Sequence, residues 1–193
     1  MSLLANFESL FKKNNIEQVQ ICYIDYCGRL CGKIIPVSKI GSIISKGVVF
    51  AKANLSFGLD DHAAENAKFL ANTGDFLANP DINSFTQIKH RPGIARFFTN
   101  MMDEEGNNWD GCPRNKLQKL INEFKDLDIN IKLSLEPEFS IYTKENETLI
   151  PFSYDGMFTV SGMDKIHLFW KELYESLKLT NINIEQVGKE YGP

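Results

Sequence analysis

The sequence contains no Cys-x-x-Cys pair, which argues against a zinc or redox cluster. Its four cysteines are Cys22, Cys27, Cys31 and Cys112, and no histidine lies near the first three. Structural zinc sites and dithiol centres need closely spaced cysteine or histidine ligands. We therefore predict that the four cysteines are reduced structural thiols.

No apolar run approaches the roughly 18–20 residues that span a bilayer. The N-terminus also lacks the order of a signal peptide, in which basic residues precede an unbroken apolar core. Instead, apolar residues recur at helical spacing, with Glu8, Lys12 and Lys13 among or after them: Leu3, Leu4, Phe7, Leu10 and Phe11. This pattern predicts an amphipathic helix in a cytoplasmic protein.

An excess of positive charge is missing as well. The formal net charge is −4, so the composition favours neither nucleic acid nor an anionic membrane as a partner. Hydrophobic residues make up 43% of the 193 residues, which is enough for one domain with a core or for two small domains.

The first half of the chain is rich in strand signals. Residues 17–24 and 30–36 predict a hairpin, in which Gly28 is free to take a positive φ. Ser38 is predicted to cap a short helix that ends at Gly47, and residues 48–53 and 94–101 predict further strands. The stretch 54–93 is irregular, and its length would be unusual for an inert loop.

The second half alternates helix and strand. Pro113 suits the first turn of a helix, and an apolar stripe follows it: Leu117, Leu120, Ile121, Phe124 and Leu127. Residues 129–142 alternate as a strand, Asp164 can cap a second helix, and Ile182 and Ile184 begin a last strand. The helix stripe predicted to face inward is Ile166, Phe169, Trp170, Leu173 and Leu177. The two halves meet near residues 103–112.

Glu136 and Glu138 lie on one face of the predicted strand 129–142, about 7 Å apart along it. The opposite face carries Leu133, Leu135, Phe139 and Ile141, which would anchor it in a core. Two adjacent carboxylates repel each other, and a bound Mg²⁺ or Mn²⁺ would relieve that repulsion through oxygen ligands. The alternative is a solvated polar strand face, because Glu-x-Glu is a common tripeptide.

Five motifs in order resemble the glutamine synthetase family. They are Tyr23-Ile-Asp-Tyr-Cys-Gly28 with Gly32-Lys33, Asp75-Phe-Leu-Ala-Asn-Pro-Asp81 with Phe85, Cys112-Pro-Arg114, Leu135-Glu-Pro-Glu-Phe139 and Glu190-Tyr-Gly-Pro193. The resemblance implies an α+β fold: an N-terminal β-grasp-like domain over residues 1–108, then the first part of a catalytic α/β domain over 109–193.

The resemblance also implies a reaction, in which ATP phosphorylates the γ-carboxylate of glutamate and ammonia displaces the phosphate to give glutamine. Two cations, Mg²⁺ or Mn²⁺, serve this phosphoryl transfer in the family. By resemblance, Glu136, Glu138 and Glu190 are metal ligands and Glu185 contacts the nucleotide. Asp25 corresponds to an aspartate that helps bind ammonium, although Asp is also an ordinary turn residue.

Departures from the family pattern limit these expectations. The chain stops at Pro193, where the family continues with Gly-Gln and another metal-binding glutamate. Its three histidines, His62, His90 and His167, lie in the wrong segments to be metal ligands and read as surface or helix residues. Full-length relatives form ring dodecamers with active sites between subunits, so we expect little activity from this chain alone.

Three interpretations stay open. The first is the N-terminal part of a glutamate–ammonia ligase. Glu190-Tyr-Gly-Pro also occurs in branches of the superfamily that act on other amines, so a γ-glutamyl-amine ligase is possible. The second is a non-catalytic protein of the same descent: a truncated gene product, or a module that docks onto full-length subunits through its β-grasp face. The third is an unrelated small α+β binding domain with its glutamates on the surface.

Overall fold

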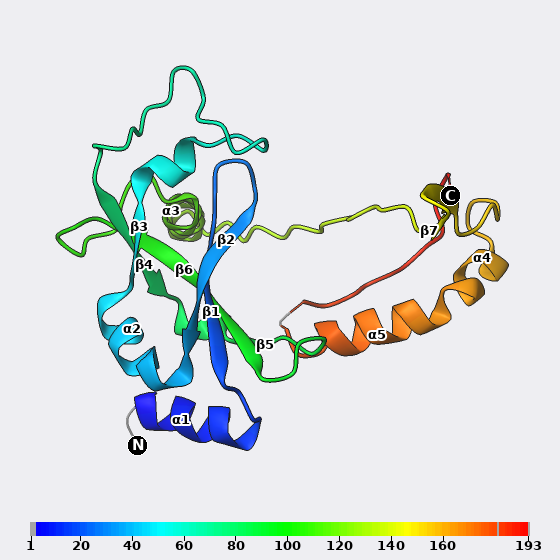
Figure 1. Cartoon of the computed structure of the whole chain (residues 1–193), viewed down its shortest axis with the longest axis horizontal. Helices are drawn as coiled ribbons and strands as arrows, with labels where there is room; N and C mark the ends of the chain where they lie inside the picture. Colours follow the sequence, from blue (N-terminus) through cyan, green and yellow to red (C-terminus); the bar gives the residue numbers. More distant parts are fainter. Residues whose placement is uncertain (1–2, 181, 193) are drawn as a thin grey trace. The chain divides into compact units, whose positions relative to one another are not determined.

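The structure is a computed structural model that describes residues 3–180 and 182–192 (Figure 1). It divides into two compact units, which we call unit 1 (Met1–Ile131) and unit 2 (Lys132–Pro193). Helices and strands occur in both units, so the predicted α+β class is confirmed. Pro193, the last residue of the Glu190-Tyr-Gly-Pro motif, lies outside the described residues.

Unit 1 is built on a sheet of six strands. The strand order is β2-β1-β6-β4-β3, and β5 also pairs with β6. β1 and β6 are parallel, and the other pairs are antiparallel. The strands are β1 (Gln18–Ile24), β2 (Leu30–Pro36), β3 (Val48–Ala51), β4 (Asp75–Pro80), β5 (Thr86–Gln87) and β6 (Ile94–Met102).

The predicted hairpin is confirmed. β1 pairs with β2 in a register that places Ile24 opposite Leu30, so residues 25–29 form the connection. Gly28 has a φ of 79°, a conformation that glycine adopts without steric cost. The strands predicted at 48–53 and 94–101 are also confirmed, as β3 and β6.

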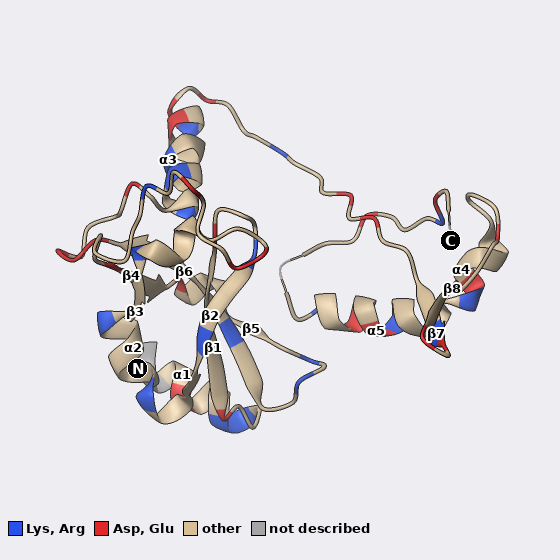
Figure 2. Ribbon diagram, turned by 45° about the horizontal axis from the view of Figure 1, so that its top comes forward, with Lys and Arg blue, Asp and Glu red and all other residues tan. Residues whose placement is uncertain are grey.

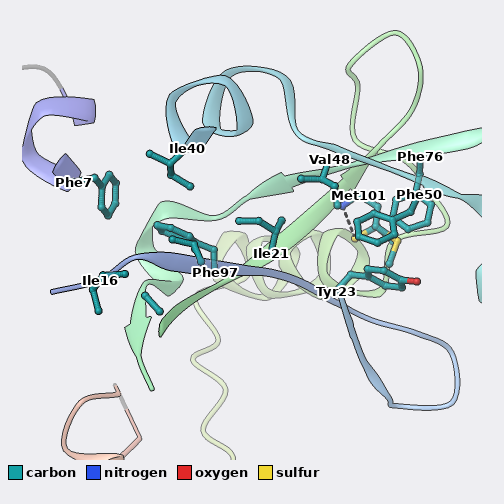
Figure 3. Packing of buried hydrophobic residues seen from close by; sticks show 14 of the residues in the cluster. Phe7, Ile16, Ile21, Tyr23, Ile40, Val48, Phe50, Phe76, Phe97 and Met101 are labelled. Carbon is teal, nitrogen blue, oxygen red and sulfur yellow. Dashed lines mark hydrogen bonds between the residues drawn. The ribbon is translucent and has the colours of Figure 1, made fainter. Parts of the chain in front are cut away.

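Two helices cover one face of this sheet. α1 (Leu3–Lys13) and α2 (Ile40–Lys46) bring Phe7, Phe11 and Ile40 into the core, where they are 8%, 3% and 2% exposed. Figure 3 shows Phe7 beside Phe97, whose ring centroid lies 5.3 Å away. The side chains of Leu3 and Leu4, which the predicted helix includes, lie outside the described residues.

The sheet curls, so that its two edge strands approach each other. Lys33 on β2 donates from Nζ to the carbonyl of Val49 on β3 at 2.8 Å, and its ammonium lies 4.5 Å from the Phe50 ring centroid. Tyr23 on β1 packs edge-on against the same ring at 4.9 Å. The contacts of Lys33 join β2 and β3, which lie at opposite ends of the strand order.

The sequence analysis missed β4 by assigning all of residues 54–93 to irregular structure. The Asn and Pro at its end are unfavourable in strands. Nevertheless β4 lies between β3 and β6, and its alternate residues Phe76 and Ala78 are fully buried. Its strand conformation therefore depends on partners that are distant in the sequence. Two 3-10 turns, Lys52–Ser56 and Ile82–Ser84, also fall in this stretch.

α3 (Pro113–Asp126) begins at Pro113 as predicted. Cys112 immediately before it is fully buried, and its sulfur accepts a hydrogen bond from the Met101 amide at 3.2 Å. The apolar stripe of α3 is less buried than the pattern predicts, because Leu117 and Leu127 are 55% and 70% exposed. The helix is thus fixed to unit 1 mainly at its first turn.

Unit 2 contains a two-stranded hairpin and two helices. They are β7 (Tyr142–Glu145), β8 (Thr148–Pro151), α4 (Val160–Lys165) and α5 (His167–Leu177). The prediction of a strand over 129–142 is wrong: residues 129–141 are an irregular segment, drawn as a coil in Figure 1. A strand is stabilised by pairing with a neighbour, and this segment has no such partner among the described residues.

Other predicted details of these helices and strands are also wrong. Leu133 and Leu135, expected in a core, are 85% and 89% exposed. No strand forms over residues 182–192, where Ile182 is 62% exposed. Asp164 lies inside α4 and caps nothing, because Ile166 precedes α5 without a side-chain cap.

Ser38 likewise fails as a cap. It lies in the 3-10 turn Val37–Lys39, and Lys39 precedes α2 without a side-chain cap. The predicted stop at Gly47 is confirmed, because Gly47 has a φ of 71° and its amide donates to the Ile43 carbonyl at 2.8 Å. No described helix is long and apolar enough to cross a membrane.

Candidate functional site

Glu136 and Glu138 lie in the irregular segment 129–141 and flank Pro137. Both side chains are exposed, and neither forms a hydrogen bond or ion pair within the described part of the chain. Proline has no amide hydrogen, so Pro137 could not have donated to a strand ladder. The two carboxylates are therefore available to an external cation.

Glu190 lies in the last described segment, residues 182–192, which is held against the loop before α4. The carbonyl of Lys189 accepts a hydrogen bond from the Phe158 amide at 2.7 Å. The Lys189 ammonium donates to the carbonyls of Glu190, at 2.8 Å, and Gly192. The chain is thus anchored at Lys189, while the side chains of Glu185 and Glu190 are exposed.

Asp155 organises the loop that receives Lys189. Its carboxylate accepts hydrogen bonds from Ser153, from Ser161 at 3.2 Å and from the Lys165 ammonium at 2.6 Å. The contact with Lys165, followed by that with Ser153, lowers the pKa of Asp155 to about 2. The sequence analysis did not identify this network. The local signal that could have indicated it is the pair of serines at 153 and 161, on either side of Asp155.

The proposed metal ligands do not converge within the described residues. Among them, no group of three or more His, Cys, Asp or Glu side chains could hold a metal ion. The donor chemistry nevertheless fits a hard divalent cation, because Glu136, Glu138 and Glu190 supply carboxylate oxygens. The chain therefore carries suitable ligands, but its described residues do not enclose a cation. His62, His90 and His167 are exposed, as predicted.

Asp25 is almost completely buried in the β1–β2 turn, with only 1% of its side chain exposed. Oδ1 accepts from the amides of Cys27 at 2.9 Å and Arg29 at 2.8 Å, and Oδ2 accepts from Arg29 Nε at 2.7 Å. Burial opposes ionisation and is the largest single effect. The hydrogen bonds from Arg29 and Cys27 together outweigh it and hold the pKa of Asp25 below its ordinary value.

Arg29 joins this turn to the loop after β3. Its guanidinium donates to Asp25 and, through Nη1, to Asp61 at 2.7 Å. Hydrogen bonds to Asp25 and then Asp61 raise the pKa of Arg29, which therefore stays charged. This arrangement gives Asp25 a structural role in the turn, as an ordinary Asx-type residue would have.

Charge is interspersed over both units. In Figure 2, lysine and arginine (blue) alternate with aspartate and glutamate (red) along the helices and loops. This mixed distribution agrees with the small net charge of −4.

Comparison with known proteins gives these features a context. Residues 110–193, which include Glu136, Glu138, Glu185 and Glu190, match the family model described as glutamine synthetase, catalytic domain. The chain is 29% identical over 168 residues to type-1 glutamine synthetase 2 of Dictyostelium discoideum, covering 83% of this chain and 32% of that protein. It is 21% identical over 189 residues to a glutamate–methylamine ligase of Methyloversatilis universalis, covering 95% and 40%.

A solved structure titled as a novel glutamine synthase homolog has the same fold. Its TM-score is 0.71 at 18% identity, and the match covers 92% of this chain and 41% of that one. The chain thus spans about a third to two fifths of the length of the curated relatives described above. The relatives named above are a glutamine synthetase and a glutamate–methylamine ligase. The chain is thus similar to glutamine synthetases, and its residues 110–193 match the catalytic domain of that family.

Proposed function

We propose that this chain provides part of an ATP-dependent ligase that joins glutamate to ammonia and forms glutamine. The observation that carries the proposal is the position of Glu136, Glu138 and Glu190. All three lie inside the region that matches the glutamine synthetase catalytic domain, and all three are exposed and unpaired within the described residues. Exposed carboxylates without a partner are poised to accept a cation.

In this proposal, Glu136, Glu138 and Glu190 bind Mg²⁺ or Mn²⁺, with sites for two ions in the complete enzyme. The cations would neutralise the charge that develops on the transferred phosphoryl group of ATP. Because the three glutamates do not converge here, we expect weak metal binding and little ligase activity from the chain alone. Glu185, in the same exposed segment as Glu190, would contact the nucleotide.

Asp25 would help bind ammonium in this scheme. Its carboxylate already accepts hydrogen bonds at both oxygens and is shielded from solvent. A role toward ammonium therefore requires Oδ2 to give up its contact with Arg29. Such an exchange replaces one cationic donor with another and leaves the backbone amides on Oδ1.

The proposal also includes the architecture of the relatives. Residues 1–108 would form a β-grasp-like domain, supported by the curled mixed sheet with β1 parallel to β6. Residues 109–193 would form the first part of the catalytic domain, supported by the family match from residue 110. The working form would be a homo-oligomeric ring in the cytoplasm.

Calorimetric titration with Mn²⁺ tests the metal site. We expect weak binding to the full chain that drops at least fivefold in Glu136→Gln, Glu138→Gln and Glu190→Gln. Glu145→Gln provides the matched control, because Glu145 is an exposed glutamate of unit 2 outside the proposed site. Identical titrations in all five proteins would contradict the metal-binding role.

A second candidate is a γ-glutamyl-amine ligase. The observation that favours it is the similarity to the glutamate–methylamine ligase of Methyloversatilis universalis, which extends over 95% of this chain. Incubation with glutamate, ATP, Mg²⁺ and either ammonium or methylamine, followed by mass spectrometry, separates the two. Glutamine alone supports the first candidate, and γ-glutamylmethylamide supports the second.

A non-catalytic docking module is the third candidate. The observation that favours it is the exposure of Leu133 and Leu135, at 85% and 89%, in a segment that pairs with no strand of the described residues. Such a segment can pair with another chain. A pull-down from the source cell should then recover a full-length synthetase, and this recovery should be lost when both leucines are changed to Ser.

A further inference from the structure

Unit 1 contains a solvent-open cavity of about 760 Å³ that the proposed function does not use. Three segments that are distant in the sequence form its walls: the β1–β2 turn at Tyr26 and Cys27, the loop over residues 55–69, and the approach to α3 at residues 109–116. Its volume falls within the roughly 300–1,000 Å³ of small-molecule sites. Part of the long irregular stretch after β3, residues 55–69, thus forms a wall of this cavity.

Three aromatic residues that line the cavity, Tyr26, Phe69 and Trp109, form a connected cluster. Phe69 lies 5.3 Å from Trp109 and 6.4 Å from Tyr26, measured between ring centroids. Trp109 stacks on the buried ring of Phe76 at 5.9 Å with an interplanar angle of 12°, so its position is fixed from the core side. Both contacts of Phe69 are tilted, at 45° to Tyr26 and 60° to Trp109, and another planar group can add to such a cluster through edge-to-face contacts.

Hydrogen bonds hold the walls in place before any ligand binds. The Tyr26 hydroxyl donates to the Gly111 carbonyl at 2.7 Å and so ties the turn to the approach of α3. The Ser56 hydroxyl donates to the Phe69 carbonyl at 2.8 Å and closes the base of the loop. A Cβ at Gly111 would overlap the Trp109 indole, which explains why glycine occupies this position.

The charges around the rings select the ligand. Lys68 and Lys116 line the cavity, and Asp110 is the acidic residue that lines it. The Lys68 ammonium already lies 5.8 Å from the Phe69 ring centroid, where a cationic ligand would otherwise bind. Lys116 is 3.7 Å from Asp110, whose side chain is fully exposed, so that ion pair is weak and exchangeable.

We propose that this cavity binds a planar aromatic anion, with its ring packed among the tilted rings of Phe69 and Trp109 and its negative group at Lys68 and Lys116. The apolar floor provides contact area, and the two ammonium groups provide selectivity for charge. The exposed Cys27 thiol lies at the same cavity and accordingly reports on its occupancy.

The probe for the test is 8-anilinonaphthalene-1-sulfonate, a planar aromatic anion whose fluorescence rises on binding. The chain has two tryptophans, so Trp170→Phe leaves Trp109 as the sole tryptophan, which can be excited selectively over the tyrosines. We expect saturable energy transfer from Trp109 to the probe. We also expect the bound probe to slow alkylation of Cys27 by a maleimide at least threefold, as measured by peptide mass spectrometry.

Charge selectivity is tested with Lys68→Gln/Lys116→Gln. This variant should bind the sulfonate at least fivefold more weakly, yet bind the uncharged N-phenyl-1-naphthylamine within twofold of the parent. Lys119→Gln/Lys125→Gln removes the same charge from exposed positions on α3 and should change neither affinity. Equal weakening by both double variants, or an unchanged rate of Cys27 alkylation at saturating probe, would overturn the proposal.

Discussion

Unit 1 and unit 2 contain similar apolar patterns in their sequences, but only unit 1 buries them. Every described residue of the hydrophobic core cluster lies between Phe7 and Cys112. In unit 2, Phe139 is 54% exposed, and it packs only at one side against Phe169 and Trp170. The difference shows that an alternating or helical pattern buries side chains only where partner elements are present to pair with it.

The largest expected effect comes from a comparison of the same substitution, phenylalanine to alanine, in unit 1 and in unit 2. Phe97→Ala should destabilise the protein by about 3–5 kcal/mol, because Phe97 is fully buried between α1 and the sheet. Phe139→Ala should cost about 1 kcal/mol, because its ring keeps only its aromatic contacts. Urea unfolding followed by far-UV circular dichroism measures both. Equal losses would show that unit 2 has a core of comparable strength.

The next effect concerns the buried charge of unit 1. Asp25→Asn should destabilise the protein by about 1–3 kcal/mol at pH 7, because hydrogen bonds to the ionised carboxylate are lost. The folded pKa of Asp25 is lowered, so its contribution is present above the unfolded value near 3.9 and disappears as the pH falls through the folded value. Urea unfolding of both proteins between pH 7 and 3 should therefore show a converging stability difference.

Asp61→Asn provides the control for Asp25. Asp61 contacts the same arginine, but its side chain is 85% exposed, so we expect a loss below about 1 kcal/mol. A constant gap between wild type and Asp25→Asn across the pH range would contradict the ionised hydrogen-bonded role.

The elements of the fold differ in how well they could be predicted from the sequence. The β1–β2 hairpin and α3 were predictable because their signals are local: Gly28 in the turn and Pro113 at the helix start. β4 was not, because Phe76 and Ala78 acquire their strand conformation from β3 and β6. The strand at 129–142 was predicted wrongly for the converse reason, since its pattern is strong but its partner is missing among the described residues.

The candidate site also contains residues that could be selected from the sequence and residues that could not. Glu136, Glu138, Glu185 and Glu190 could be selected from their motifs, and their roles stay predictions. The Asp155 network could not be selected, because the ion pair with Lys165 depends on how α4 folds back onto the loop. The domain boundary near residue 108 also stays a prediction.

A smaller effect concerns Asp155, a carboxyl group of unit 2 whose pKa is strongly lowered. The pKa of Asp155 is lowered to about 2, so its contacts persist well below the ordinary value near 3.9 and are lost as the pH falls through about 2. Carboxyl ¹³C NMR during acid titration should show this, and Lys165→Gln should shift the pKa upward. Lys171→Gln, an exposed lysine on α5, should leave it unchanged.

The smallest expected effect is at Lys189. Lys189→Ala removes the ammonium that binds the carbonyls of Glu190 and Gly192 but keeps the backbone bond from Phe158. Exposed interactions of this type are worth about 0.2–1 kcal/mol, so we expect roughly two- to fivefold faster amide hydrogen exchange at Phe158. Lys171→Ala should give no change. Exchange as slow as in wild type would show that the side chain does not anchor the segment.

The most direct test of the proposed metal site is NMR of the full chain during addition of substoichiometric Mn²⁺, whose unpaired electrons broaden nearby resonances. We predict that the signals of residues 136–138 and of Glu190 broaden together, and that Glu136→Gln/Glu138→Gln removes the broadening at Glu190. Broadening at other acidic positions, such as Asp60 and Asp61, with residues 136–138 and Glu190 unaffected, would contradict the proposed role of these glutamates.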